Sequence, residues 1–149
     1  MKIVRSIVAI VVGLLVGVLV VSLIWAVGHV IYPQLEGLGK MIMDPDVSRQ
    51  TKFEAMRELP VGALAAVLIA WLSGAFVGGA VAAAGASCCR CVHAGIIGGF
   101  VLLASVMMMV MVPHLDWMII GGLATPLPMS LLAGMFVSAL FSPQEAPPV

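Results

Sequence analysis

The sequence predicts an all-α membrane protein, on two observations. First, four long runs contain no Asp, Glu, Lys or Arg: 6–35, 59–89, 91–115 and 117–144. Each run holds the roughly 20 apolar residues that a helix needs to cross the hydrocarbon core of a bilayer. Second, hydrophobic residues make up 62% of the 149 residues and charged residues only 9%, which leaves little for a soluble domain. We therefore expect a single four-helix transmembrane domain over 1–149.

The first span is expected at about Val4–Val30. Lys2 and Arg5 precede a long apolar stretch that ends near the small residues at 26–28, an arrangement that also occurs in signal peptides. The apolar region of a signal peptide is roughly 7–15 residues long, and this stretch is longer. We therefore expect an uncleaved spanning helix.

The extramembrane loop, 31–60, carries most of the charged residues of the chain. Tyr32-Pro33 should end the first span, because proline disfavours helical geometry in the residue before it. Turns are expected next, at Gly37, Gly39 and Asp44-Pro45.

A short amphipathic helix should follow at Val47–Leu59, with Asp46 as its N-cap. Phe53, Met56 and Leu59 share one face of that helix. Such a helix normally rests its apolar face at the headgroup boundary of the bilayer. The alternative is a partner's helix lying in the same groove.

The remaining spans are expected at Val61–Ala86, Val92–Val112 and Trp117–Phe141, followed by a short tail over 142–149. Only a few residues join these three spans, so they are antiparallel neighbours. In the last span, Thr125-Pro126-Leu127-Pro128 removes two backbone donors and predicts a kink. Broken helices line substrate sites in some transporters, but more often Ser or Thr hydroxyls satisfy the freed carbonyls.

Small residues mark the expected contacts between the spans. The second span repeats them every four residues: Gly62, Ala66, Ala70, Gly74, Gly78, Ala82 and Ala86. Matching residues on the other spans are Ala9, Gly13 and Gly17, then Gly95 and Gly99, then Ser130, Gly134 and Ser138. In lipid, close backbone approach at small residues drives helix association, and this spacing favours a crossing angle of roughly −40°. These faces close one bundle or, where in surplus, serve a homo-oligomer or a larger complex.

The orientation follows from the positive residues nearest the spans. Lys2, Arg5 and Arg90 lie on one side, whereas the turn 113–116 on the other side has no Lys or Arg. The first span usually dominates the topology. We therefore expect both termini in the cytoplasm and the loop 31–60 outside.

Several function classes are disfavoured. The expected spans contain no charged residue at depth, whereas proton relays, ion-coupled transport and intramembrane acid–base catalysis generally need one. The net charge is +0, with seven Lys and Arg residues in all, which argues against a nucleic-acid partner. We predict no catalytic residue and no cofactor.

Three clusters at the expected helix ends are weighed as metal sites. In the first, Cys88, Cys89, Cys91 and His93 form a CxxC motif with an imidazole nearby. Structural zinc usually takes two separated ligand pairs, and this chain has one pair. Inert or lipidated cysteines are therefore the favoured interpretation.

In the second cluster, Met107, Met111 and His114 share one helical face. Thioether and imidazole ligands suit Cu(I). The neighbouring methionines point around most of the helix, which favours adaptable packing instead.

The third cluster joins residues that the topology places at the outer face: His29, Tyr32, Glu36, His114, Asp116 and Trp117. His29, Glu36, His114 and Asp116 are candidate ligands for a divalent metal, headgroup contacts or a partner's binding site. The favoured alternative is an interfacial belt, in which the amphipathic rings of Tyr32, His114 and Trp117 lie at the membrane surface. Phe53 and Met56 of the short helix are expected at the same interface.

A set of short motifs resembles a family of small uncharacterised four-helix bacterial inner-membrane proteins. The motifs are Tyr32-Pro33, Leu59-Pro60, the glycines Gly74, Gly78 and Gly79, Pro113-His114 with Trp117, and Leu127-Pro128. Members often have a proline where this chain has Leu115. The resemblance implies four helices and a bacterial inner membrane, and it carries no activity.

We expect a structural or interaction role, as an accessory subunit of a larger membrane assembly, with the lipid bilayer and other membrane subunits as partners. Passive transport by an oligomer is one alternative, favoured by the kinked last span and disfavoured by the lack of polar pore-lining residues. Metal binding at the outer face is the other.

Overall fold

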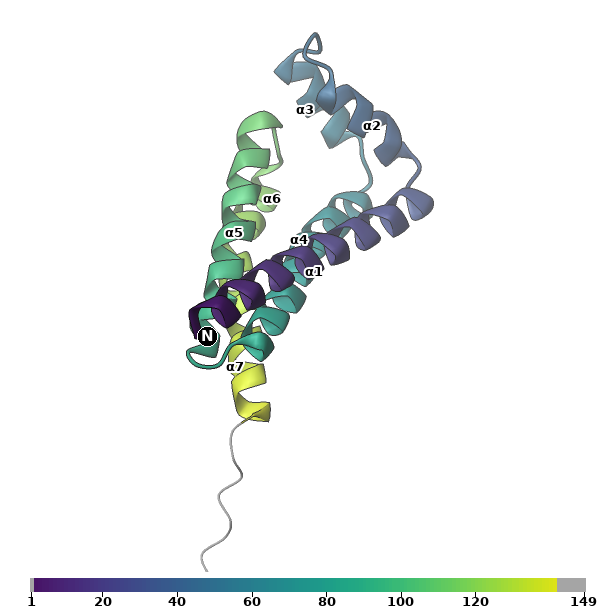
Figure 1. Cartoon of the computed structure of the whole chain (residues 1–149). Helices are drawn as coiled ribbons and strands as arrows, with labels where there is room; N and C mark the ends of the chain where they lie inside the picture. The colour runs from purple at the N-terminus through teal and green to yellow at the C-terminus, as the bar shows by residue number, and fades with distance from the viewer. Residues whose placement is uncertain (1, 142–149) are drawn as a thin grey trace, which may run out of the picture.

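The computed structural model describes residues 2–141, which are almost entirely helical (Figure 1). The helices are α1 (Lys2–Ile31), α2 (Gln34–Met43), α3 (Arg49–Arg57), α4 (Val61–Gly85), α5 (Arg90–Met111), α6 (Asp116–Ala124) and α7 (Pro126–Leu140). Within this part of the chain, four spans are long and apolar enough to cross a membrane: α1, α4, α5, and α6 with α7. The predicted class and number of spans are confirmed, and they support a membrane location.

α4 lies at the centre of the bundle and packs against α1, α5 and α7. α1 packs mainly on α4, through glycines on both helices. A Cβ at Gly13 would lie 2.7 Å from the carbonyl oxygen of Gly78 and 2.8 Å from the Cβ of Ala82. A Cβ at Gly17 would lie 3.0 Å from the carbonyl oxygen of Gly74. The two backbones are therefore in direct contact, as small-residue packing in lipid requires.

α7 packs on α5 and on a neighbouring face of α4. A Cβ at Gly134 would lie 2.8 Å from the Cβ of Ala94 in α5, and one at Gly79 would lie 3.2 Å from the Cα of Ser130. A Cβ at Gly95 would lie 3.3 Å from the Cδ2 of Leu131, at the end of that side chain in α7. Gly99 differs from these glycines, because nothing lies within 4 Å of the Cβ position there.

The predicted interruption of the last span occurs at Thr125, between α6 and α7. Pro126 cannot donate a backbone hydrogen bond, so the ladder is broken there. The Thr125 hydroxyl donates to the carbonyl oxygen of Gly121, and the amide of Met129 donates to the carbonyl oxygen of Thr125 at 3.0 Å. The Gly121 carbonyl oxygen also accepts from the Thr125 amide at 3.2 Å. The hydroxyl therefore adds a second bond at the end of α6 and does not satisfy the carbonyls of Gly122 and Ala124, whose amide donors the two prolines remove.

The prediction of turns at Gly37 and Gly39 is wrong, because both glycines lie inside α2. Two interactions outweigh the low helix propensity of glycine. Leu35 is 4% exposed and anchors one side of α2 on the bundle. On the exposed side, the Lys40 ammonium donates to the Glu36 carboxylate at 2.9 Å, one turn apart.

The predicted cap of the next helix is also corrected. α3 begins after Ser48, whose hydroxyl oxygen accepts from the amide of Thr51 at 3.1 Å. Asp46 belongs instead to a preceding turn, in which its amide donates to a side-chain oxygen of Asp44 at 2.9 Å.

The apolar face of α3 packs against the protein itself. Met56 is 3% exposed and forms a buried cluster with Leu64, Val112 and Met118, against which Leu59 packs. The expectation that this face rests at the headgroup boundary is therefore not confirmed. We call α2 and α3 together the cap, and the end of the bundle that they cover the cap end (Figure 1).

Three long-range side-chain bonds lie at the two ends of the molecule. At the cap end, the Arg49 Nη1 donates to the carbonyl oxygen of Val110 at 3.2 Å, and the Lys52 ammonium donates to the last turn of α2 at 2.9 Å. At the other end, the Arg5 Nε donates to the carbonyl oxygen of Gly85 at 2.9 Å. Figure 1 shows the start of α1 and the end of α7 at this second end, which we call the terminal end.

Candidate functional site

The candidate metal ligands of the outer face do not gather. The His29 Nδ1 lies 2.9 Å from the carbonyl oxygen of Trp25, and its ring contacts the Trp25 indole with centroids 4.6 Å apart. Lys40 pairs with Glu36 and lowers the pKa of that carboxyl group through a hydrogen bond and its charge. Asp116 is exposed at the start of α6. Among residues 2–141, no three His, Cys, Asp or Glu side chains form a group that could hold a metal ion.

His114 is instead a buried structural residue under the cap. It is 8% exposed, its Nδ1 lies 2.7 Å from the carbonyl oxygen of Val112, and its ring lies beside the Trp71 indole with centroids 6.1 Å apart. Burial lowers the pKa of His114, because the imidazolium would lose its hydration, and the hydrogen bond to Val112 offsets this in part. The neutral imidazole is therefore favoured in the folded protein.

The cysteine cluster lies at the terminal end, in the turn between α4 and α5 and in the first turn of α5. Cys88 and Cys89 are exposed, whereas His93 is buried with its Nδ1 3.2 Å from the carbonyl oxygen of Cys89. Cys88 raises the pKa of the Cys89 thiol through a side-chain hydrogen bond and its charge. A raised pKa lowers the thiolate fraction, so this arrangement does not activate Cys89 as a nucleophile.

The methionine and histidine cluster is split between two environments. Met107 and Met111 are exposed on the apolar outer surface of α5, whereas His114 is buried under the cap. The structure thus gives no support to a common copper site for these three residues.

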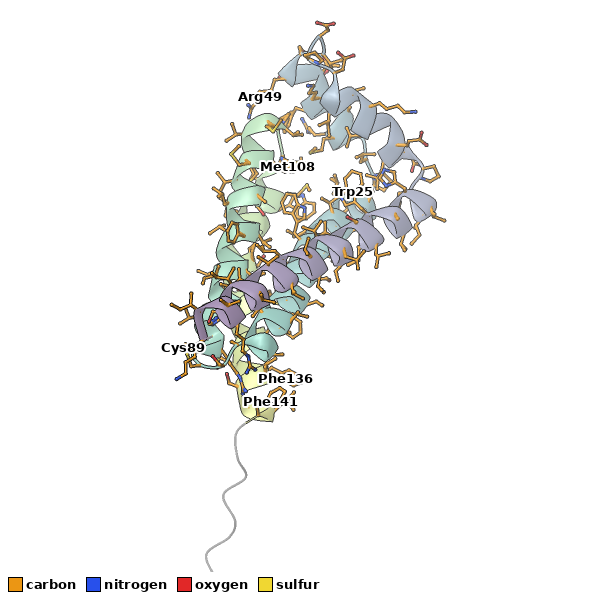
Figure 2. All side chains as sticks on the ribbon, in the orientation of Figure 1. Trp25, Arg49, Cys89, Met108, Phe136 and Phe141 are labelled. Carbon is orange, nitrogen blue, oxygen red and sulfur yellow. The ribbon has the colours of Figure 1, made fainter. Side chains whose placement is uncertain are left out.

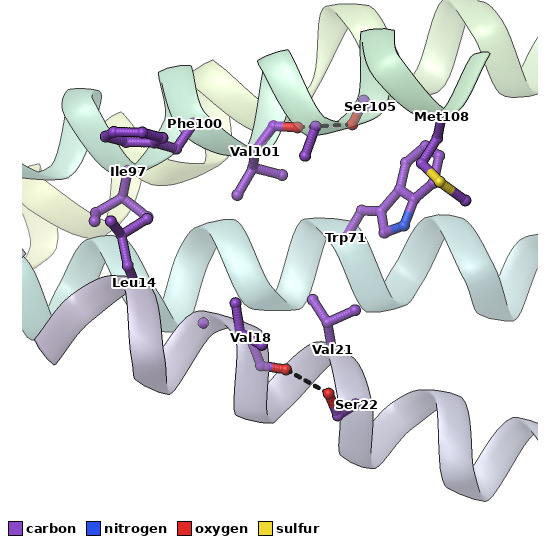
Figure 3. A pocket seen from close by; sticks show the side chains of 12 residues that line it. Leu14, Val18, Val21, Ser22, Trp71, Ile97, Phe100, Val101, Ser105 and Met108 are labelled. Carbon is purple, nitrogen blue, oxygen red and sulfur yellow. Dashed lines mark hydrogen bonds between the residues drawn. The ribbon is translucent and has the colours of Figure 1, made fainter. Parts of the chain in front are cut away.

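The structure does contain an apolar cleft of about 350 Å³ between α1 and α5, next to α4 (Figure 3). α1 and α5 lie close together at the terminal end and diverge toward the cap end (Figure 1). The cleft is lined by Leu14, Gly17, Val18, Val21 and Ser22 of α1, by Trp71 of α4, and by Ile97, Phe100, Val101, Ala104, Ser105 and Met108 of α5. Its volume lies within the range of small-molecule sites in proteins.

The two hydroxyl groups in the cleft wall are already used. The Ser22 hydroxyl donates to the carbonyl oxygen of Val18 at 2.9 Å, and the Ser105 hydroxyl donates to that of Val101 at 2.9 Å (Figure 3). Their protons therefore satisfy carbonyls of their own helices. The cleft presents a hydrocarbon surface, which suits an apolar ligand and not an ion.

A second, smaller cavity of about 60 Å³ lies directly under the cap. Trp71 and Met108 line both this cavity and the cleft, while Leu35, Met56 and His114 line the cavity alone. Trp71 and Met108 therefore lie between the cleft and the cavity under the cap.

Sequence reasoning did not identify the cleft, although one signal for it exists. Trp71 is a large side chain among the small residues of α4, and it points toward α5 beside Met108 (Figure 3). The divergence itself depends on how three helices pack together, which residue spacing along one helix does not reveal.

No family model, curated protein or solved structure matches this chain. The resemblance to four-helix bacterial inner-membrane proteins therefore stays a prediction.

Proposed function

We propose that the protein is a non-enzymatic membrane interaction protein, an accessory subunit that binds a transmembrane helix of a larger assembly along α5. One observation carries this proposal: Gly99 lies open on an apolar face of α5. Val92, Ile96 and Leu103 on that face are 59%, 37% and 58% exposed, and nothing lies within 4 Å of the Cβ position at Gly99. A partner helix can approach the backbone closely at such a glycine.

The other packing glycines make Gly99 distinctive. Gly13, Gly17 and Gly134 each lie against the backbone or a Cβ atom of a neighbouring helix. The intramolecular bundle thus uses the small faces of these helices and leaves Gly99 outside. This supports a role for the Gly99 face in an intermolecular contact.

The polar groups of the spans support binding and not catalysis. The hydroxyls of Ser22, Ser105 and Thr125 donate to carbonyls four residues back on the same chain. His93 likewise lies within hydrogen-bond distance of a carbonyl oxygen one turn earlier. These side chains are thus engaged with backbone carbonyls one turn earlier.

The proposed location is a bacterial inner membrane with both termini in the cytoplasm. Lys2, Arg5 and Arg90 belong to the terminal end, where Arg5 bonds the end of α4. Positive residues beside spans favour the cytoplasmic side. The cap would then face outward.

The test is purification from the native membrane in mild detergent, with identification of the copurifying proteins. We expect the parent protein to bring a larger membrane protein in fixed stoichiometry, and Gly99→Leu to lose it. Gly37→Leu is the matched control, because nothing lies within 4 Å of its Cβ position either and it lies in the cap. Purification of the parent alone in several detergents, or retention of the partner by Gly99→Leu, would contradict the proposal.

A further inference from the structure

We infer that the cap is a pH-sensitive lid, which swings away from the bundle when the imidazole of His114 beneath it is protonated. Three features of the cap end carry this inference: a hinge along one edge of the cap, a latch at another edge, and an apolar cavity that encloses His114. The Gly99 face and its proposed partner take no part in it.

The hinge consists of the two short connections between the cap and the bundle. Tyr32-Pro33 joins α1 to α2, and the segment 58–60, which ends with Pro60, joins α3 to α4. The Tyr32 phenol lies against Gly62 in the first turn of α4, so the two connections are side by side. Proline donates no backbone hydrogen bond, which interrupts the helical ladder at each connection. The cap can therefore turn about this edge without the loss of a helix.

The latch is a single hydrogen bond away from the hinge. Arg49 in the first turn of α3 donates from its Nη1 to the carbonyl oxygen of Val110, near the end of α5, at 3.2 Å. Figure 2 shows Arg49 beside this end of α5, on the side of the cap away from the end of α1. Among residues 2–141, it is the one side-chain hydrogen bond between the cap and the bundle. Within the cap, the Lys52 ammonium donates to the carbonyl oxygen of Ile42 at 2.9 Å and ties α3 to α2.

His114 lies under the cap, in the turn between α5 and α6, and lines the cavity of about 60 Å³. The walls of this cavity come from α1 to α6, and none of its other lining residues has a titratable or charged side chain. The cap supplies Leu38, Ile42 and Met56 to these walls. The cap is therefore part of the apolar enclosure around the imidazole.

The charged groups of the cap end are exposed or engaged elsewhere. Asp116 is two residues from His114 but is exposed at the start of α6, and His29 of α1 stacks on Trp25. Glu36 and Lys40 pair with each other on the exposed side of α2. Apart from Arg49 and Lys52, the other charged residues of the segment 34–60 are exposed as well: Asp44, Asp46, Glu54, Arg57 and Glu58. Protonation with the lid closed thus places a charge among apolar side chains, with the Val112 carbonyl oxygen as its hydrogen-bond partner.

Protonation therefore favours the open lid. Burial lowers the pKa of His114 in the closed state, whereas an open lid lets water hydrate the imidazolium. The open state takes up the proton first as the pH falls below the ordinary value of 6.5. The ratio of open to closed lids then rises by up to about tenfold per pH unit and levels off below the closed-state pKa. With the cap outside, as proposed, the lid responds to the pH outside the membrane.

The experiment measures the distance between nitroxide labels on either side of the latch. Gln50→Cys and Met111→Cys place the labels next to Arg49 and Val110, at exposed positions, in a chain whose three native cysteines are changed to Ser. Electron paramagnetic resonance of the protein in lipid nanodiscs gives the distance distribution between pH 8 and pH 5. We expect one short distance at pH 8 and a second, longer distance that grows below pH 6.5 at up to about tenfold per pH unit.

Variants of the labelled protein assign the change to His114. His114→Gln and His114→Met are neutral at every pH and should keep the short distance at pH 5, whereas His29→Gln should behave as the parent does. A second label pair, at the exposed positions Gly37 and Glu54 of α2 and α3, reports on the cap itself. Its distance should be the same at pH 8 and pH 5, because the cap moves as one body.

A Gln50–Met111 distance that does not change between pH 8 and pH 5 in the parent would overturn the inference. A change that persists in both His114 variants would do so too, since another group would then be the trigger. A Gly37–Glu54 distance that changes with the Gln50–Met111 distance would show that the cap unfolds, which also contradicts a swinging lid.

Discussion

Gly13 of α1 and Gly78 of α4 pack reciprocally, each against the backbone of the other. A Cβ at Gly13 would lie 2.7 Å from the carbonyl oxygen of Gly78, and a Cβ at Gly78 would lie 2.7 Å from the carbonyl oxygen of Gly13. A methyl group on either residue must push the two helices apart. This contact positions α1, and therefore one wall of the cleft.

Substitution of either glycine should destabilise the bundle. We expect Gly13→Ala and Gly78→Ala each to lower the free energy of unfolding by about 1–3 kcal/mol, the usual cost of overpacking. Gly99→Ala is the control, because its Cβ position is open and alanine favours a helix by roughly 0.5–1 kcal/mol. Unfolding in mixed detergent micelles measures the three values. Equal stability of all three variants would contradict the direct backbone contact between α1 and α4.

Protonation of His114 should weaken the cap end. Burial holds the pKa of His114 below its ordinary value of 6.5, so the unfolded chain takes up the proton first as the pH falls. Stability should therefore be unaffected by this group above about pH 6.5, fall below it, and level off once the pH passes the folded pKa. Thermal unfolding between pH 8 and pH 5 measures the effect.

Two variants separate His114 from other groups in that experiment. His114→Gln should flatten the part of the profile below pH 6.5, and His29→Gln should leave it in place. Stability that rises as the pH falls, or a profile unchanged by His114→Gln, would contradict the assignment.

The Thr125 hydroxyl should stabilise the break between α6 and α7. Thr125→Val removes its bond to the carbonyl oxygen of Gly121 and should cost about 0.5–1.5 kcal/mol, the usual net value of one hydrogen bond. Thr125→Ser retains a hydroxyl and should cost less. Unfolding in mixed micelles measures both variants, and a Val variant as stable as the parent would show that the bond contributes nothing.

The exposed cysteines report the orientation in the membrane. Cys88 and Cys89 are exposed at the terminal end, which the proposed topology places in the cytoplasm. In intact spheroplasts an impermeant maleimide should therefore label them only after permeabilisation. Gly37→Cys, in a chain with its three native cysteines changed to Ser, should be labelled without permeabilisation because Gly37 lies in the cap. The reverse pattern would place the cap in the cytoplasm.

Residue patterns along single helices predicted the spans well. Lipid requires long apolar helices and close packing at small residues, and both properties are local. The charge-free runs therefore predicted α1, α4 and α5, and the four-residue spacing predicted that Gly13 and Gly17 would face small residues of another span.

The cap and the cleft could not be predicted from local patterns, because both depend on contacts between residues that lie far apart in the sequence. Gly37 and Gly39 indicate turns locally, but burial of Leu35 on the bundle holds them in a helix. Asp46 and Ser48 are both of residue types that favour the N-cap position. The Asp46 amide donates to Asp44 in a turn, and Ser48 is the N-cap. The cleft follows from the divergence of α5 from α1 and α4, which no local pattern encodes.

The central claim is that a partner helix lies on the Gly99 face of α5, and site-specific photocrosslinking in the native membrane tests it most directly. A photoreactive residue replaces Leu103, which is 58% exposed on that face, or Leu19, which is 57% exposed on α1. The account predicts one discrete crosslinked protein from position 103 and none of that mass from position 19. Crosslinks only to lipid from position 103, or the same product from both positions, would contradict it.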